Sequence, residues 1–256
     1  MTAHRILILG GTTEARRLAE RLAQRDDIAA TISLAGRTSD PIPLPLPTRN
    51  GGFGGVDGLV DYLAKESIDL IVDATHPFAE QISANAAKAA AVSGVKIFAL
   101  RRPTWDQVEG DCWTRVADVG AAVIALGETP RTVFLAIGRQ EAGRFAAAPQ
   151  HDYLVRSVDP VEPPLAVPRC RYILTTGPFR EADECRLLEE NHVDAVVAKN
   201  SGGSATYGKI AAARRLGIEV IMVERPRQPG IEAVASVEAA LTLIDQRRSP
   251  AWERGE

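Results

Sequence analysis

Residues suited to binding an anion follow the first apolar run of the chain. Residues 6–9 are all apolar, and residues 15–22 repeat apolar side chains at the spacing of an amphipathic helix. Between them stand Gly10, Gly11, Thr12, Thr13 and Glu14. Glycine lets a ligand approach the backbone closely, and the free N–H groups at a helix start favour negative charge. The stretch therefore suits a phosphate. It lacks the G-x-G-x-x-G fingerprint and the Walker lysine, and a tight turn without a ligand explains it equally well.

Arg37 follows the second predicted strand, residues 28–34. In dinucleotide-binding folds an acidic residue near this point binds the ribose hydroxyls, whereas an arginine accommodates a 2′-phosphate. The acid is missing here and the arginine is present. Arg37 therefore favours NADPH over NADH, with a solvated loop arginine as the alternative.

Thr75, His76 and Pro77 form the exit loop of a third buried strand, residues 69–74. Ligands of open α/β sheets bind where the carboxyl ends of the strands meet a change of direction. We therefore expect this loop to border one crevice with Arg37 and the first turn, and to contact the cofactor. His76 alternatively caps the helix that follows.

A second set of glycines and cations follows predicted strands in the other half of the chain. Successive backbone N–H groups in such turns form anion-binding nests, and the cations suit carboxylates. The set predicts a site for a small polyanion. Its residues are Gly138, Arg139, Thr176, Gly177, Lys199, Asn200, Ser201, Gly202 and Gly203.

Lys199 is the preferred catalytic candidate of this set. A lysine at the end of a buried strand pairs with a substrate carboxylate and, when partly desolvated, delivers a proton. The alternative is a structural lysine that pairs with a neighbouring acid.

The remaining pattern predicts an α/β fold of two doubly wound, Rossmann-like parallel-sheet domains with the active cleft between them. A strand, an Arg-Pro loop, a short strand and an alanine-rich helix occur twice, beginning at ALRRPTW and at MVERPRQPG. The predicted domains are residues 1–128, which bind NADPH, and residues 129–256, which bind the polyanion. The expected helices include residues 56–65, 80–92, 181–190 and 209–216.

Composition excludes several classes of function. The net charge is −3, so no global attraction to nucleic acid or a membrane is expected. The three cysteines and four histidines are scattered, which predicts neither disulfides nor a metal site. The absence of an apolar run of spanning length and of a signal-peptide pattern predicts a cytoplasmic protein.

An NADPH-dependent reductase is the enzyme class favoured by these residues. A short-chain dehydrogenase would carry Tyr-x-x-x-Lys, which is missing, and a methyltransferase would carry an acid after the second strand. A nucleotide-sensing regulatory module remains as the non-enzymatic alternative, although the cationic loops of the second half would then be superfluous.

The chain resembles the precorrin-6A reductases of cobalamin biosynthesis. The resemblance runs through LILGGTTEARRLA (7–19), AGR (35–37), GGFGG (51–55), DATHPFA (73–79), LRRPTW (100–105), FLAIGRQE (134–141), TTGPF (175–179), KNSGG (199–203) and TYGKI (206–210). It implies an oxidoreductase acting on CH–CH bonds, which reduces one double bond in the macrocycle of precorrin-6A with NADPH and gives precorrin-6B. The implied substrate is a tetrapyrrole polycarboxylate, and its product would be handed over to other enzymes of the corrin pathway. The cobalt-containing equivalent of the same step is the alternative.

The role of Arg37 is testable with both nicotinamide cofactors. Replacing Arg37 by alanine should weaken NADPH binding by about 1.5–3 kcal/mol, about ten-fold to over a hundred-fold, because a charge-assisted contact to the 2′-phosphate is lost. NADH affinity should change little. Titration of Arg37→Ala with the two cofactors measures both, and equal weakening would show that Arg37 does not bind the 2′-phosphate.

Overall fold

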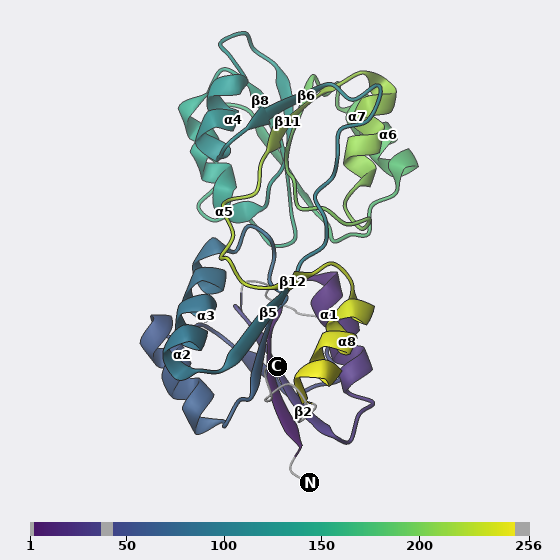
Figure 1. Cartoon of the computed structure of the whole chain (residues 1–256). Helices are drawn as coiled ribbons and strands as arrows, with labels where there is room; N and C mark the ends of the chain where they lie inside the picture. The colour runs from purple at the N-terminus through teal and green to yellow at the C-terminus, as the bar shows by residue number, and fades with distance from the viewer. Residues whose placement is uncertain (1–2, 37–42, 249–256) are drawn as a thin grey trace. The chain divides into compact units, whose positions relative to one another are not determined.

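The computed structural model describes residues 3–36 and 43–248, and the chain forms two compact units. Unit 1 comprises Met1–Pro103 and Arg227–Glu256, and unit 2 comprises Thr104–Pro226. Each unit contains one six-stranded sheet in which every strand pair is parallel. The predicted class, two parallel-sheet α/β domains, is therefore confirmed (Figure 1).

The sheet of unit 1 has the strand order β12-β5-β4-β1-β2-β3. Its strands are β1 (His4–Leu9), β2 (Ile28–Leu34), β3 (Thr48–Asn50), β4 (Leu70–Asp73), β5 (Lys96–Leu100) and β12 (Ala233–Val234). Its helices are α1 (Thr13–Leu22), α2 (Gly55–Lys65), α3 (Glu80–Ser93) and α8 (Val237–Arg248). Helices α1 and α8 cover one face of the sheet, and α2 and α3 cover the other (Figure 1).

Strand β1 lies at the centre of both apolar layers of unit 1. Ile6 and Ile8 pack into the layer under α1 and α8, whereas Leu7 and Leu9 pack into the layer under α2 and α3. All four side chains are at most 1% exposed. Burying each contributes about 1.5–3 kcal/mol. The uninterrupted apolar run of the sequence thus reflects a strand that is covered on both faces.

The sheet of unit 2 has the strand order β6-β11-β10-β7-β8-β9. Its strands are β6 (Trp113–Val116), β7 (Thr132–Ala136), β8 (Asp152–Ser157), β9 (Cys170–Leu174), β10 (Ala195–Lys199) and β11 (Glu219–Val223). Its helices are α4 (Val119–Ala125), α5 (Arg139–Ala142), α6 (Glu181–Glu190) and α7 (Gly208–Leu216), with a 3₁₀ helix at Gly143–Ala147. Helices α6 and α7 lie on one side of the sheet in Figure 1, and α4 and α5 lie on the other.

The two units exchange their last strand and helix, which corrects the predicted boundary between residues 128 and 129. After β5 the chain leaves unit 1, and β6 then pairs with β11 in unit 2. After β11 it returns, and β12 pairs with β5. The repeated pattern in the sequence is real, but in each copy the short strand and helix complete the sheet of the other unit. Figure 1 shows the result, with α8 from the end of the chain beside α1.

No helix in the described part of the chain is long and apolar enough to cross a membrane.

His151 predicts a loss of stability at mildly acidic pH. The residue is fully buried, and its Nδ1 accepts a hydrogen bond of 3.2 Å from the Arg131 backbone N–H. Burial lowers the pKa of His151 below its usual value of 6.5. The folded protein therefore binds this proton less readily than the unfolded chain, so the stabilisation is present above about pH 6.5 and is lost as the pH falls below it.

The free energy of unfolding should accordingly decrease between about pH 7 and about pH 5.5, by at most about 1.4 kcal/mol per pH unit for one histidine. His4, whose pKa burial also lowers, contributes in the same direction. His151→Gln should flatten the pH profile of the melting temperature, and His192→Gln, at an exposed histidine, is the control. An unchanged slope in His151→Gln would contradict the assignment.

Candidate active site

The first turn of unit 1 begins α1 with an accessible backbone. Gly11 is exposed, has φ +120°, and would carry a Cβ into open space. Gly10 is different, because a Cβ there would lie 2.8 Å from Ile32 Cδ1, so close packing on β2 requires this glycine. Thr12 is the N-cap, and its hydroxyl accepts from the Ala15 N–H at 3.1 Å. The turn can therefore admit an anion at Gly11, Thr12 and Thr13.

A buried carboxylate shapes the loop that follows β4. Asp73 is 1% exposed and accepts from Thr75 Oγ1 at 2.7 Å and from the Arg101 guanidinium at 3.1 Å. The Thr75 hydroxyl also lies 3.2 Å from Ser83 Oγ. Thr75 is thus bound within the fold, and it positions the next two residues.

His76 and Pro77 stand at the end of this loop. His76 Nδ1 accepts from the Phe78 N–H at 3.3 Å, a bond within the loop and not a cap on α3, whose N-cap residue Ala79 has no side-chain cap bond. Pro77 is buried, and its carbonyl accepts from Gln228 Nε2 at 2.8 Å. Of the two, the half-buried His76 has the more accessible side chain.

Hydrogen bonds join the turns of unit 1 at one edge of the sheet. Thr12 Oγ1 donates to the Ala74 carbonyl at 2.8 Å, and Arg102 Nη1 donates to Glu14 Oε2 at 2.7 Å. The loops after the adjacent strands β1, β4 and β5 therefore converge as the topology predicts. The Glu14 carboxylate is engaged by Arg102. Arg37 lies outside the described residues.

In unit 2, Lys199 meets the turn after β7. Lys199 Nζ lies 3.6 Å from Glu141 Oε1, and the lysine side chain is 15% exposed. Arg144 Nε is 3.1 Å from the other oxygen of Glu141. Gly138, with φ +85°, is the N-cap residue of α5, and Arg139 Nη1 lies 3.8 Å from Asp159 Oδ2. The lysine thus pairs with a neighbouring acid, next to the turn after β7 that carries Arg139.

The two residues that follow Lys199, Asn200 and Ser201, are buried. Asn200 is 1% exposed, and its amide hydrogen-bonds the backbone N–H and carbonyl of Trp105 at 2.8 and 3.1 Å. Ser201 is 7% exposed. Gly202 and Gly203 follow with φ of +68° and +77°. The Asn200 side chain therefore holds Trp105 and is fully engaged within the fold.

The loop containing Thr176 and Gly177 is held through Phe179. The Phe179 N–H donates to the Ala205 carbonyl at 2.9 Å, and the Arg156 guanidinium stacks 3.7 Å from the centre of its ring. Arg156 is itself buried and hydrogen-bonded to Glu184 at 2.5 Å. Gly177 therefore lies beside the Ala205 carbonyl, and the preceding Thr176 is exposed.

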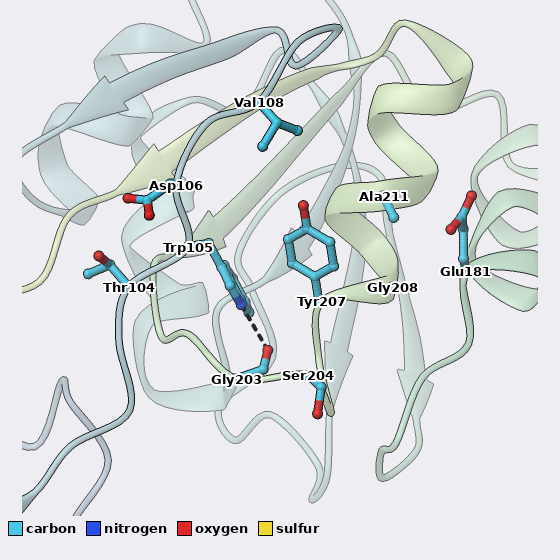
Figure 2. Close-up of a pocket in the computed structure, with 10 residues that line it drawn as sticks. All are labelled: Thr104, Trp105, Asp106, Val108, Glu181, Gly203, Ser204, Tyr207, Gly208 and Ala211. Atoms are coloured by element: carbon cyan, nitrogen blue, oxygen red, sulfur yellow. Dashed lines mark hydrogen bonds between the residues drawn. The ribbon is translucent and has the colours of Figure 1, made fainter. Parts of the chain in front are cut away.

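Sequence reasoning missed a cavity of about 470 Å³ at the start of α7 (Figure 2). It is lined by Thr104, Trp105, Asp106, Val108, Glu181, Gly203, Ser204, Tyr207, Gly208 and Ala211. Trp105 Nε1 donates to the Gly203 carbonyl at 2.8 Å, and its ring lies 5.7 Å from that of Tyr207. The signal was present in LRRPTW and TYGKI, two motifs to which no contact was assigned.

Among the described residues, no group of three or more His, Cys, Asp and Glu side chains is arranged to hold a metal ion.

The fold and these turns define a two-domain protein of the doubly wound α/β class, with glycine-bearing turns and cations at the carboxyl ends of its strands. The chain belongs to the precorrin-6x reductase family, because the family model described as Precorrin-6x reductase CbiJ/CobK matches residues 5–245.

Individual relatives agree with this assignment. A precorrin-6A reductase of a Sinorhizobium species is 61% identical over 98% of this chain and 96% of its own. One of Rhodobacter capsulatus is 50% identical over 96% of this chain and 98% of its own. The solved structure of a CobK precorrin-6A reductase matches with a TM-score of 0.92 at 48% identity, covering 97% of this chain and 98% of that one. A cobalt-precorrin-6A reductase of Priestia megaterium is 27% identical over 95% of this chain and 100% of its own.

Thr12 provides a test of how the first turn is held. Thr12→Ala removes both the helix cap and the bond to Ala74, so it should lower the free energy of unfolding by about 0.5–2 kcal/mol. Thr12→Ser keeps the hydroxyl and should remain close to the wild type. Thermal denaturation of the two variants compares them, and equal melting temperatures would show that the hydroxyl does not hold the turn.

Proposed function

We propose that this protein reduces one double bond of the precorrin-6A macrocycle with NADPH, giving precorrin-6B, in cobalamin biosynthesis. The observation that carries the proposal is the 61% identity, over nearly the full length of both chains, to a protein named precorrin-6A reductase. The geometry supports it with the accessible start of α1 in unit 1 and the cations near the end of β10 in unit 2. A regulatory module that only senses nucleotides would need no second set of cationic turns.

The residues of unit 1 fit a dinucleotide. The open space over Gly11 and the N–H groups at the start of α1 would take the pyrophosphate, and Arg37 would take the 2′-phosphate. His76 stands on the adjacent loop after β4. When bound, the nicotinamide supplies the hydride, while the protein aligns the ring and excludes water.

The residues of unit 2 fit the carboxylates of a tetrapyrrole. Arg139 and Lys199 supply positive charge, and the backbone of Gly138, Gly177 and Gly202 to Gly203 supplies N–H groups in turns. Each cation already faces an acid, Asp159 and Glu141 respectively. A substrate carboxylate would replace these acids as the partner of each cation. Before the substrate binds, the acids keep the cationic side chains extended toward the site.

We further propose that the substrate is the metal-free macrocycle. Five relatives named precorrin-6A reductase are 43–61% identical to this chain, whereas three named cobalt-precorrin-6A reductase are 25–28% identical. Steady-state reduction of precorrin-6A and of its cobalt derivative by the purified protein with NADPH tests this proposal. A higher kcat/KM for the cobalt derivative would contradict it.

Lys199 has two separable roles in this proposal. Lys199→Ala should raise the dissociation constant of precorrin-6A about ten-fold or more, because a charge-assisted contact to a carboxylate is lost. If the lysine also delivers the proton, the single-turnover rate at saturating NADPH and substrate should fall by about 10²–10⁴.

Glu141→Gln is the matched variant, because it removes the resting partner of the lysine and leaves the lysine in place. It should retain the rate. Lys199→Ala with neither constant changed would remove Lys199 from the site and leave the loops of unit 2 as scaffold.

A further inference from the structure

Two short segments carry the chain between the units, and both are attached to the loop that follows Lys199. We name them the first crossing segment, residues 101–105, and the second crossing segment, residues 225–228. The first passes from unit 1 to unit 2 at Pro103 and Thr104, and the second returns at Pro226 and Arg227.

Asn200 fixes the first crossing segment inside unit 2. Its side chain donates to and accepts from the backbone of one residue, Trp105, so it restrains both the position and the direction of the segment. The Trp105 indole adds a third bond, to the Gly203 carbonyl. The Asn200 side chain is buried, so these bonds do not compete with water.

Arg225 fixes the second crossing segment to the same loop. Its Nε donates to the Asn200 carbonyl and its Nη2 donates to the Ser201 carbonyl, each at 2.9 Å. The planar guanidinium makes both bonds at once, which sets the orientation of the two peptide groups. Asn200 is therefore held by one segment through its side chain and by the other through its backbone.

In unit 1 the same segments are attached to the turns proposed to bind the dinucleotide. Arg101 binds Asp73 beneath the loop after β4, and Arg102 binds Glu14 beside the first turn. Gln228 binds the Pro77 carbonyl. Trp105 follows Arg102 by three positions, and Gln228 follows Arg225 by three, with a proline inside each interval. Each interval is three residues long, so it spans at most about 11 Å when fully extended.

We propose that Asn200 is a positioning residue that couples dinucleotide binding in unit 1 to the conformation of residues 199–203 in unit 2, through the two crossing segments. The inference rests on the proposed function, because it requires the dinucleotide at the turns of unit 1. When the first turn or the loop after β4 moves, the residues bonded to it, Arg102, Arg101 or Gln228, move with it. The crossing segments then transmit this movement to Asn200. The coupling is reciprocal, so a ligand at residues 199–203 also alters dinucleotide affinity.

Hydrogen–deuterium exchange of the full chain with NADPH as the only ligand tests the coupling. In the wild type NADPH should slow exchange in peptides covering residues 10–15 and also in peptides covering residues 198–206. Asn200→Ala should keep the first effect and lose more than about half of the second, because the first segment is no longer held. Asn191→Ala is the matched control. Its amide also lies in unit 2 but bonds Leu187 and Arg171, and it should behave like the wild type.

Three outcomes of the exchange experiment would contradict the coupling. Slowed exchange at residues 198–206 that survives in Asn200→Ala would overturn the inference, because NADPH would then act on the loop by another route. Protection at residues 10–15 with none at 198–206 in the wild type would also overturn it and would leave the proposed function intact. No protection at residues 10–15 would instead overturn the proposed cofactor site, and the inference with it.

A second variant applies if Asn200→Ala does not fold. Arg225→Lys keeps the charge but cannot form the two-carbonyl fork, so it should also lose part of the protection at residues 198–206. Full protection in Arg225→Lys would contradict the role of the second segment.

Discussion

Each sheet of this protein is completed at one edge by a strand that follows a crossing of the chain from the other unit. β6 pairs with β11 along Trp113 to Val116, and β12 pairs with β5 at Ala233 and Val234. The helices that follow these strands bury apolar side chains in their new units, as Val237, Ala240 and Ile244 of α8 do in unit 1. This exchange requires the chain to cross between the units twice, and the edge strand of each sheet follows one of these crossings.

Both units use a buried acid and arginine to hold a loop at the carboxyl ends of their strands. In unit 1 Asp73 and Arg101 lie beneath residues 75–77, and in unit 2 Glu184 and Arg156 lie beneath residues 176–179. Removing one partner of such a pair leaves a buried charge and costs about 3–5 kcal/mol, whereas the intact pair adds little net stability. Their contribution is to the shape of the loops, because each carboxylate or guanidinium contacts a residue of the loop itself.

Local structure was largely predictable, and the assembly of the sheets was not. The helix expected at residues 181–190 is α6, and the expected strand at 28–34 is β2, because apolar spacing and flanking polar residues define such elements. The convergence of Thr12 with the loop after β4 followed from parallel topology. The exchange was missed because β6 and β12 are only four and two residues long, and nothing in so short a strand specifies which open sheet edge it joins. The role of Asn200 was missed for a related reason, since its partner Trp105 is distant in sequence and is bound through its backbone.

The exchange also sets the order in which the protein can be completed during synthesis. Unit 2 is a continuous stretch inserted into unit 1, so all of its strands have been made once Pro226 has been translated. Unit 1 begins first but lacks β12 and α8 until the end of the chain emerges. Until then the apolar surfaces of α1 and β5 that α8 covers remain open to solvent or to chaperones. Unit 2 can therefore be completed before unit 1, although unit 1 begins first in the chain.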